Sequence, residues 1–211
     1  SIFSYNRQDI IHFLGVTYEL VTKKLKIGNV MKEYYHYYGA SLSVKVCRDY
    51  SINQLKVLNF AVKELGIKHF RLMSYWDEIE PNIGQYNFAD LDEQFRLLEK
   101  LGAKISLSIG IKQPRWPECH APKWTNKITQ PQKEEALLSF IELVIKRYKN
   151  SPALLNYQLE NEALLKNFGD CPNHIYSRSL LKKELSLVKQ IDPKRNIIMS
   201  VSNNWGLPIL S

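Results

Sequence analysis

The tetrapeptide Leu159-Glu160-Asn161-Glu162 closes an apolar run that begins at Ala153. The run contains Leu154, Leu155 and Tyr157 and has the length and composition of a buried strand. The polar residues after it would stand at the C-terminal end of that strand, which is where (β/α)8 barrels place the groups that do chemistry. Taken alone, the four residues also fit an ordinary polar strand end that leads into a loop.

Short apolar runs and longer amphipathic segments alternate along most of the chain. We predict strands near 40–46, 68–73, 104–109, 153–159 and 196–201, and helices at about 51–65, 90–101, 132–148 and 176–190. This order is typical of parallel βα units. The predicted fold class is α/β, of the (β/α)8 TIM-barrel type, truncated after about the fifth strand. We expect two regions, an N-terminal helical extension at 1–38 and a partial (β/α) barrel of catalytic type at 39–211.

The composition limits the classes of function. The chain has 211 residues, of which 45% are hydrophobic and 24% charged, enough for one well-packed domain. Its net charge is +8, but the Lys and Arg residues are scattered along amphipathic segments, so solvated helix faces explain them better than a nucleic-acid site. No stretch approaches the ~20 apolar residues of a membrane span. The chain opens at Ser1 without the pattern of a signal peptide.

Three cysteines, Cys47, Cys119 and Cys171, show no Cys-x-x-Cys spacing, which argues against a structural zinc site. Cys119 and Cys171 each follow a predicted strand. A disulfide between them is one expectation if the compartment is oxidising, which would suggest an extracytoplasmic location. Two free thiols are the other expectation. No metal and no cofactor is predicted.

Three motifs, in order along the chain, resemble those of one enzyme clan. The first is Phe70-Arg71-Leu72 followed by Tyr75 to Pro81 and Gly84 to Phe88; the second is Gly110 to His120; the third is Tyr157 to Glu162. Together they resemble the clan of retaining glycoside hydrolases that includes the cellulase-like family 5 and the β-galactosidase-like family 42. The resemblance covers about Gly39 to Gly206.

The resemblance implies roles for three of these residues. Glu162 matches the general acid/base of the clan, and Asn161 matches the amide that binds the sugar 2-hydroxyl. Arg71 matches the second-strand arginine that supports the nucleophilic carboxylate. The implied substrate is an oligo- or polysaccharide with β-linkages.

The chemistry of glycoside cleavage asks for a carboxyl group that is still protonated near neutral pH, because the glycosidic oxygen leaves only when it receives a proton. Burial or a neighbouring carboxylate provides this. Glu160 is a candidate neighbour, since residues two apart on a strand face the same side. We favour a different role for Glu160, as a buried partner of a basic barrel residue such as Arg71.

Aromatic and polar residues in the predicted loops are candidates for sugar binding. The rings of Trp76 and Trp116 offer flat faces on which a sugar stacks, and packing in the core is the alternative for each, as it is for Trp124. Gln113 and Arg115 are candidate hydroxyl binders beside them.

A retaining enzyme needs a second carboxylate about 5 Å from the first, and the clan supplies it from the seventh strand. The chain shows five predicted strands, and loop carboxylates such as Glu118 and Asp170 cannot be assumed to replace it. We therefore predict a glycoside hydrolase-like protein in which Glu162 is the acid and the nucleophile is missing from this chain. The alternative is a non-catalytic carbohydrate-binding or assembly protein on a truncated barrel, with self-association through open sheet edges.

Overall fold

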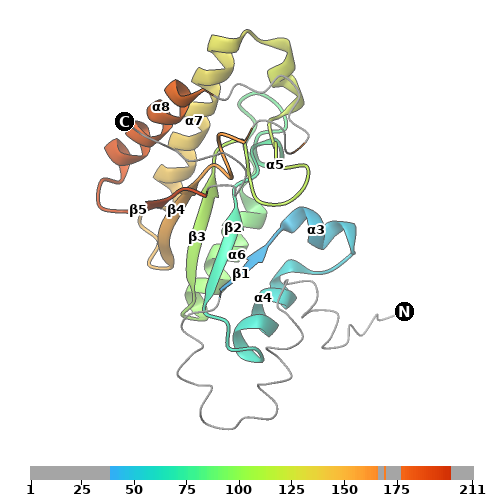
Figure 1. Ribbon diagram of the computed structural model, residues 1–211. Helices are drawn as coiled ribbons and strands as arrows, with labels where there is room; N and C mark the ends of the chain where they lie inside the picture. The colour runs from blue at the N-terminus through green and yellow to red at the C-terminus, as the bar shows by residue number, and fades with distance from the viewer. Residues whose placement is uncertain (1–38, 166–168, 170–176, 201–211) are drawn as a thin grey trace.

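The computed structural model describes residues 39–165, 169 and 177–200. Five parallel strands form one sheet in the order β1-β2-β3-β4-β5 (Figure 1). Their bounds are β1 Gly39–Leu42, β2 His69–Met73, β3 Lys104–Ile109, β4 Leu154–Leu159 and β5 Asn196–Ile198. The predicted α/β class and the five parallel strands are confirmed, while the predicted N-terminal helical extension lies outside the described residues.

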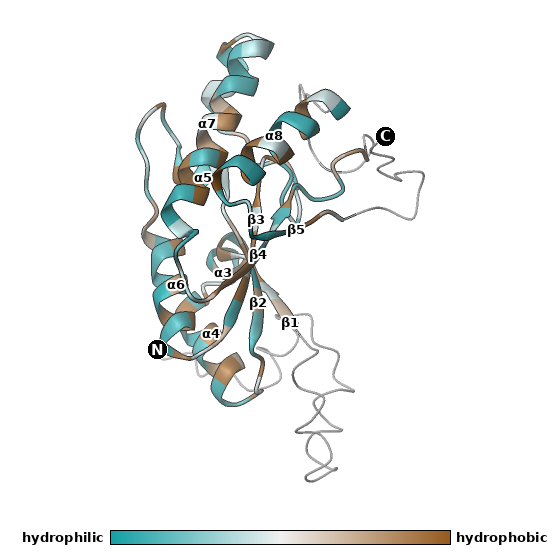
Figure 2. Ribbon diagram, turned by 90° about the vertical axis from the view of Figure 1, so that its left-hand side faces the viewer, coloured by the Kyte–Doolittle hydropathy of each residue, from teal (hydrophilic) through white to brown (hydrophobic). Residues whose placement is uncertain are grey.

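Helices follow the strands in the expected alternation. They are α3 Val44–Asp49, α4 Gln54–Lys63, α5 Trp76–Ile79, α6 Ala89–Lys100, the 3-10 helix Lys123–Lys127, α7 Gln130–Tyr148 and α8 Arg178–Ile191. The four longest correspond to the four predicted helices. Figure 2 shows α4, α6 and α7 on the same side of the sheet, and α7 packs against α8.

Two local predictions differ from the structure because of capping side chains. The first strand ends at Leu42, not at residue 46, since the side chain of Ser43 accepts a hydrogen bond from the Val46 N–H and starts α3. The next helix begins at Asn53, whose side chain accepts from the Lys56 N–H, rather than at Ser51. Short polar residues therefore divide one predicted strand into a strand and a helix.

The two faces of the sheet differ in chemistry, as the strand register shows. One row runs Leu42, Leu72, Leu107, Tyr157 and Ile197 across the five strands. The first four of these side chains are buried under the helices, at 0–1% exposure. Burial of such side chains contributes about 1.5–3 kcal/mol each. This row is the base of the hydrophobic core, which α6 and α7 complete with buried side chains such as Phe95 and Val144.

The adjacent row faces away from the helices and is polar throughout. It consists of Ser41, Arg71, Ser106, Asn156 and Asn196. All five are partly or fully exposed in the described structure. In a closed barrel this face lines the interior, so the strands carry the alternation expected of barrel strands with a polar inner surface.

Candidate active site

The ends of β3 and β4 are bound to each other by the side chain of Glu160. Its carboxylate, 1% exposed, accepts hydrogen bonds from the N–H groups of Ile111 (2.8 Å) and Lys112 (2.5 Å). The backbone continues the pairing, because Asn161 N–H donates to the carbonyl of Lys112 at 2.8 Å. The loop after β3 and the loop after β4 therefore form one unit.

Gly110 makes room for this carboxylate. Its φ is +106°, and a Cβ at this position would lie 2.0 Å from Oε1 of Glu160. Both the left-handed backbone and the close approach require glycine here. The Gly-Ile-Lys segment thus carries a structural requirement that its sequence alone does not reveal.

Lys112 holds the next part of the β4 loop. Its side chain is fully buried, and its Nζ donates to the carbonyls of Glu162 (3.1 Å) and Leu165 (3.0 Å). Burial lowers the pKa of Lys112, and the charges of Glu118, Glu160 and Glu162 oppose that shift. The position of residues 162–165 is therefore fixed from the β3 side.

The segment 111–120 folds back on itself above the sheet. Gln113 N–H donates to the Glu118 carbonyl (2.8 Å), and His120 N–H donates to the Ile111 carbonyl (3.0 Å). The tip carries Arg115 and Trp116, both exposed, with 70% of Trp116 accessible. The hairpin thus presents a flat apolar ring to solvent at its tip.

Glu118 turns back from this hairpin toward Asn161. The two oxygens of its carboxylate accept from Asn161 Nδ2 at 3.3 and 3.2 Å. Burial raises the pKa of Glu118; the hydrogen bond from Asn161 and the charge of Lys112 lower it, and the charge of Glu162 raises it. Asn161 and Glu162 thus lie next to a buried carboxylate. Glu118 and Asn161 are 43 positions apart in the sequence.

Glu162 lies just beyond the strand, with a partly exposed side chain. Both Glu160 and Glu162 have left-handed backbone conformations, with φ of 53° and 49°. The prediction that they share one strand face is wrong, because β4 ends at Leu159. Glu162 N–H donates to Ser200 Oγ at 2.9 Å, which ties it to the end of the β5 segment.

Arg71 is half-buried on the inner face of the sheet, but its partners differ from the prediction. Its Nε donates to Ser41 Oγ (2.9 Å) and its Nη1 to Gln158 Oε1 (3.0 Å). Glu160 instead binds backbone N–H groups, since its left-handed conformation turns it toward β3. Burial lowers the pKa of Arg71, and the charge of Arg115 lowers it further.

Two residues predicted to bind sugar have their side chains in the interior. Trp76 is 0% exposed, stacks on Phe140 with ring centroids 5.5 Å apart, and donates its indole N–H to Glu80 at 2.7 Å. Gln113 is also fully buried and donates to the Gly110 carbonyl at 2.9 Å. Packing is therefore the role of Trp76, and Gln113 stabilises the turn after β3.

A second polar cluster, formed by Lys45, Asp77 and His120, was not predicted from the sequence. Lys45 Nζ donates to Asp77 Oδ2 (2.5 Å) and contacts His120 Nδ1 (3.0 Å). The His120 ring packs against Tyr75 with centroids 4.2 Å apart. Burial, aided by the charge of Lys45, lowers the pKa of His120 to about 3. The ring is therefore neutral at pH 7.

The cysteines have different states. Cys47 is a free, buried thiol, and Cys119 is disulfide-bonded. The expectation of a free thiol is thus excluded for Cys119. Cys171, the partner considered in the sequence, lies outside the described residues.

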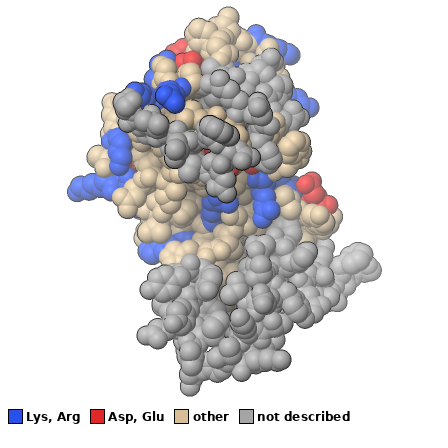
Figure 3. Space-filling model, in the orientation of Figure 1, with Lys and Arg blue, Asp and Glu red and all other residues tan. Residues whose placement is uncertain are grey.

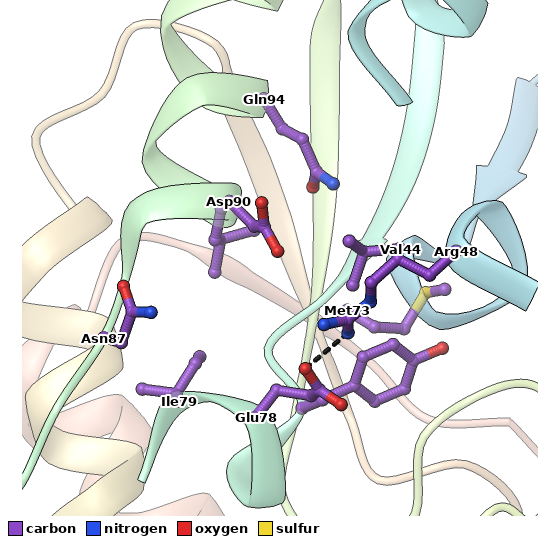
Figure 4. Close-up of a pocket in the computed structure, with 10 residues that line it drawn as sticks. Val44, Arg48, Met73, Glu78, Ile79, Asn87, Asp90 and Gln94 are labelled. Carbon is purple, nitrogen blue, oxygen red and sulfur yellow. Dashed lines mark hydrogen bonds and ion pairs between the residues drawn. The ribbon is translucent and has the colours of Figure 1, made fainter. Parts of the chain in front are cut away.

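A small pocket lies apart from Asn161 and Glu162, between α3, α5 and α6. Its volume is about 80 Å³. Figure 4 shows the Arg48–Glu78 ion pair on one side of it, with Asp90 and Gln94 of α6 on another. Because the volume suits only a few water molecules, we assign it no ligand.

The charged surface agrees with the scattered basic residues of the sequence. In Figure 3, Lys and Arg side chains stand at separate places on the described part of the visible face. Within the described ranges, no helix has the length and apolar content needed to cross a bilayer. In the same part of the chain, no group of three or more His, Cys, Asp or Glu residues could hold a metal ion.

A family model provides the identification. Residues 33–207 match the model described as cellulase, glycosyl hydrolase family 5. The chain belongs to glycosyl hydrolase family 5. The match includes all five strands and the Asn161-Glu162 pair, and it confirms the resemblance drawn from the motifs.

Solved structures similar to this family 5 chain are glycoside hydrolase barrels. One is a GH5_18 protein from Streptomyces cattleya in complex with GlcNAc, with 16% identity, a TM-score of 0.55, and coverage of 70% of this chain and 39% of that one. Another is an exo-β-1,4-mannosidase from Opitutaceae bacterium strain TAV5, with 17% identity, a TM-score of 0.60, and coverage of 77% and 31%.

These similarities show the barrel fold, of which the described sheet is a part. The chain spans about a third to two-fifths of the length of these two proteins. No curated protein matches the sequence.

The contact between Gly110 and Glu160 predicts a large effect of a small substitution. We expect Gly110→Ala to lower the free energy of unfolding by about 4 kcal/mol, because the added methyl displaces a carboxylate that satisfies two buried N–H groups. Gly102→Ala is the matched control, since Gly102 has a φ of +66° and open space at its Cβ position. That variant should lose about 1 kcal/mol. Urea unfolding of both variants measures the difference, and equal losses would contradict the role of Glu160.

The neutral state of buried His120 predicts acid sensitivity. Its folded pKa of about 3 lies below the usual 6.5, so the unfolded chain binds more protons between these values and stability falls as the pH falls. Between pH 7 and pH 5 we expect His120 to contribute a loss of about 2 kcal/mol. Urea unfolding of the wild type and of His120→Gln at both pH values tests this. Between pH 7 and pH 5, the free energy of unfolding of His120→Gln should fall by about 2 kcal/mol less than that of the wild type. Equal losses in both proteins would refute the neutral state of buried His120.

Proposed function

We propose that this family 5 chain carries the acid/base half of a retaining glycosidase site for β-linked glycans. The observation that supports this is the Asn161-Glu162 pair at the C-terminal end of β4, held in place by the β3 loop through Glu160 and Lys112. Barrel enzymes place their reacting groups at this end of the sheet. Glu162 is the proposed general acid and base.

As the proposed general acid and base, Glu162 has a partly exposed side chain that would act on a bound glycoside. In the first step it would donate its proton to the glycosidic oxygen as the bond to the anomeric carbon breaks. In the second step its carboxylate would take a proton from the attacking water. The amide of Asn161 would hold the hydroxyl next to the anomeric carbon.

The proposed mechanism also needs a nucleophilic carboxylate about 5 Å from Glu162. Among the described residues, Glu118 is the carboxylate bound to Asn161, but it is buried and accepts two contacts from the amide. A nucleophile must reach the anomeric carbon, so we do not assign Glu118 this role. We propose that the nucleophile comes from a barrel strand outside the described residues.

The exposed tip of the β3 hairpin is the proposed sugar platform. Trp116 offers an accessible ring face, and Arg115 offers donors beside it. Sugar rings stack on such faces through their C–H groups. Arg71 lies on the inner face of the sheet and donates a hydrogen bond to Gln158. We propose that it contributes to substrate binding indirectly, by orienting the Gln158 side chain.

Carbohydrate binding without turnover is the second candidate. It is favoured by one observation: among the described residues, the carboxylate that binds Asn161 is that of Glu118, and it is buried, so we assign no nucleophile there. Both candidates use Asn161 and Trp116, and they differ in whether Glu162 transfers a proton.

The decisive measurement is hydrolysis of aryl β-glycosides by the protein from its native source, with its intact mass determined in parallel. We expect activity that Glu162→Gln lowers by about 10²–10⁴-fold, the usual contribution of a positioned acid/base. Glu142→Gln, which alters an exposed i,i+4 ion pair, is the control. Activity unaffected by Glu162→Gln would refute the assignment, and binding without turnover at a mass of 24.7 kDa would favour the second candidate.

The role of Trp116 is tested separately. We expect Trp116→Ala to weaken binding of β-1,4-linked oligosaccharides by about 3- to 10-fold, which corresponds to the loss of one aromatic stacking contact. Trp116→Phe should restore most of it. Titration followed by tryptophan fluorescence or NMR measures the change, and equal affinity in the wild type and Trp116→Ala would exclude the platform.

A further inference from the structure

A chain of hydrogen bonds links the inner face of the sheet to the β3 hairpin. Arg71 Nη1 donates to Gln158 Oε1 at 3.0 Å. Gln158 Nε2 donates to Asn161 Oδ1 at 3.1 Å. Asn161 Nδ2 then donates to the Glu118 carboxylate at 3.2 and 3.3 Å. The chain runs from a guanidinium to a carboxylate through two amides.

The direction of this chain is fixed by its two ends. An arginine side chain has donors only, so the oxygen of Gln158 must face it. The nitrogen of Gln158 then faces the oxygen of Asn161, and the nitrogen of Asn161 faces the carboxylate. An ionised carboxylate has acceptors only. Neither amide can rotate by 180° without placing like groups against each other at both of its ends.

Neighbouring hydroxyl groups strengthen this orientation. Ser200 Oγ donates to Asn161 Oδ1 at 3.3 Å, so the amide oxygen accepts from two groups. Ser108 Oγ donates to Gln158 Oε1 at 3.4 Å. With its oxygen occupied, the Asn161 amide can offer a ligand only an N–H donor.

We propose that Glu118 is a positioning residue that fixes the Asn161 amide with its N–H toward the bound sugar. The inference rests on the function proposed above, in which Asn161 holds a hydroxyl of a β-glycoside. The carboxylate of Glu118 takes one N–H of the amide and leaves the other for the oxygen of a sugar hydroxyl. A rotated amide would present its oxygen to the carboxylate, which repels it. Glu118 therefore acts through Asn161 rather than on the reacting atoms.

The orientation of the amide can be measured without any ligand. In the ¹⁵N-labelled chain, we expect the two Nδ2 protons of Asn161 to have separated shifts and one to exchange slowly with solvent. Glu118→Ala should bring both shifts toward those of a free asparagine and speed the exchange at least about 10-fold, as the loss of a charge-assisted hydrogen bond implies. Glu118→Gln should give an intermediate result, because the introduced amide oxygen still accepts but carries no charge. Glu142→Gln should leave the signals unchanged.

A second variant tests the proposal from the other end of the chain. Gln158→Glu keeps an acceptor for Arg71 but removes the donor to the Asn161 oxygen. Gln158→Glu should also alter the Asn161 signals. This measurement remains possible if Glu118→Ala does not fold. Signals unchanged in Gln158→Glu and in the folded Glu118 variants would overturn the proposal.

Sugar binding provides the functional arm, with cellobiose and β-1,4-mannobiose as probes. Glu118→Ala should weaken binding of the probe that the wild type prefers by about 5- to 10-fold, the effect of losing one hydrogen bond between the Asn161 amide and the sugar. Asn161→Ala should weaken it similarly, and the double variant should be no weaker than Asn161→Ala alone.

The outcomes separate this inference from the proposed function. If Asn161→Ala abolishes binding while Glu118→Ala changes neither binding nor the amide signals, the sugar site stands and the positioning role of Glu118 is refuted. If neither Asn161→Ala nor Trp116→Ala alters binding, the proposed sugar site itself is refuted, and the role of Glu118 in sugar binding falls with it.

Discussion

The carboxylate of Glu160 is the group on which the geometry of the site depends. It leaves the end of β4, crosses to the end of β3 and accepts from two backbone N–H groups that would otherwise be buried without partners. An unsatisfied buried N–H costs about 1–3 kcal/mol, so the interaction is strongly specified. It also requires glycine at position 110 and a left-handed conformation at Glu160. Because of this conformation, the backbone turns after β4, and Asn161 and Glu162 lie at the C-terminal end of the sheet.

The polar row across the sheet connects the barrel interior with this site. Arg71 lies in the row between Ser41 and Ser106, and its guanidinium reaches one layer toward the C-terminal ends of the strands to bind Gln158. Gln158 is 4% exposed and contacts Asn161 directly. The inner face of the strands is therefore linked to the proposed site, because its arginine binds the amide of Gln158, which in turn binds the amide of Asn161.

The local elements followed from the sequence, whereas the contacts that join the loops did not. Alternating apolar runs located the five strands, and Gly66 and Gly102, with φ of 70° and 66°, end helices as glycine does. The prediction that Trp76 binds sugar was wrong, because a tryptophan in such a motif can equally pack in the core. Here its ring stacks on Phe140 of α7. The contact between Glu118 and Asn161 joins residues 43 positions apart, and the alternation of side chains along a strand cannot indicate it. The positive φ values of Glu160 and Glu162 end that alternation just after β4, at the proposed site.

Lys112 shows that the position of the β4 loop and its electrostatics are set together. Its ammonium group is buried and binds the carbonyls of Glu162 and Leu165, while the carboxylates of Glu118, Glu160 and Glu162 stabilise its charge. Breaking a buried charge cluster by removing one partner is costly, because the remaining charges lose their compensation. The loop that carries Glu162 thus cannot move away from the β3 hairpin without separating Lys112 from the carboxylates of Glu160 and Glu162 and from the two carbonyls that it binds. The backbone position of Glu162, the proposed acid, is therefore set by the buried charge of Lys112 as well as by hydrogen bonds between the two loops.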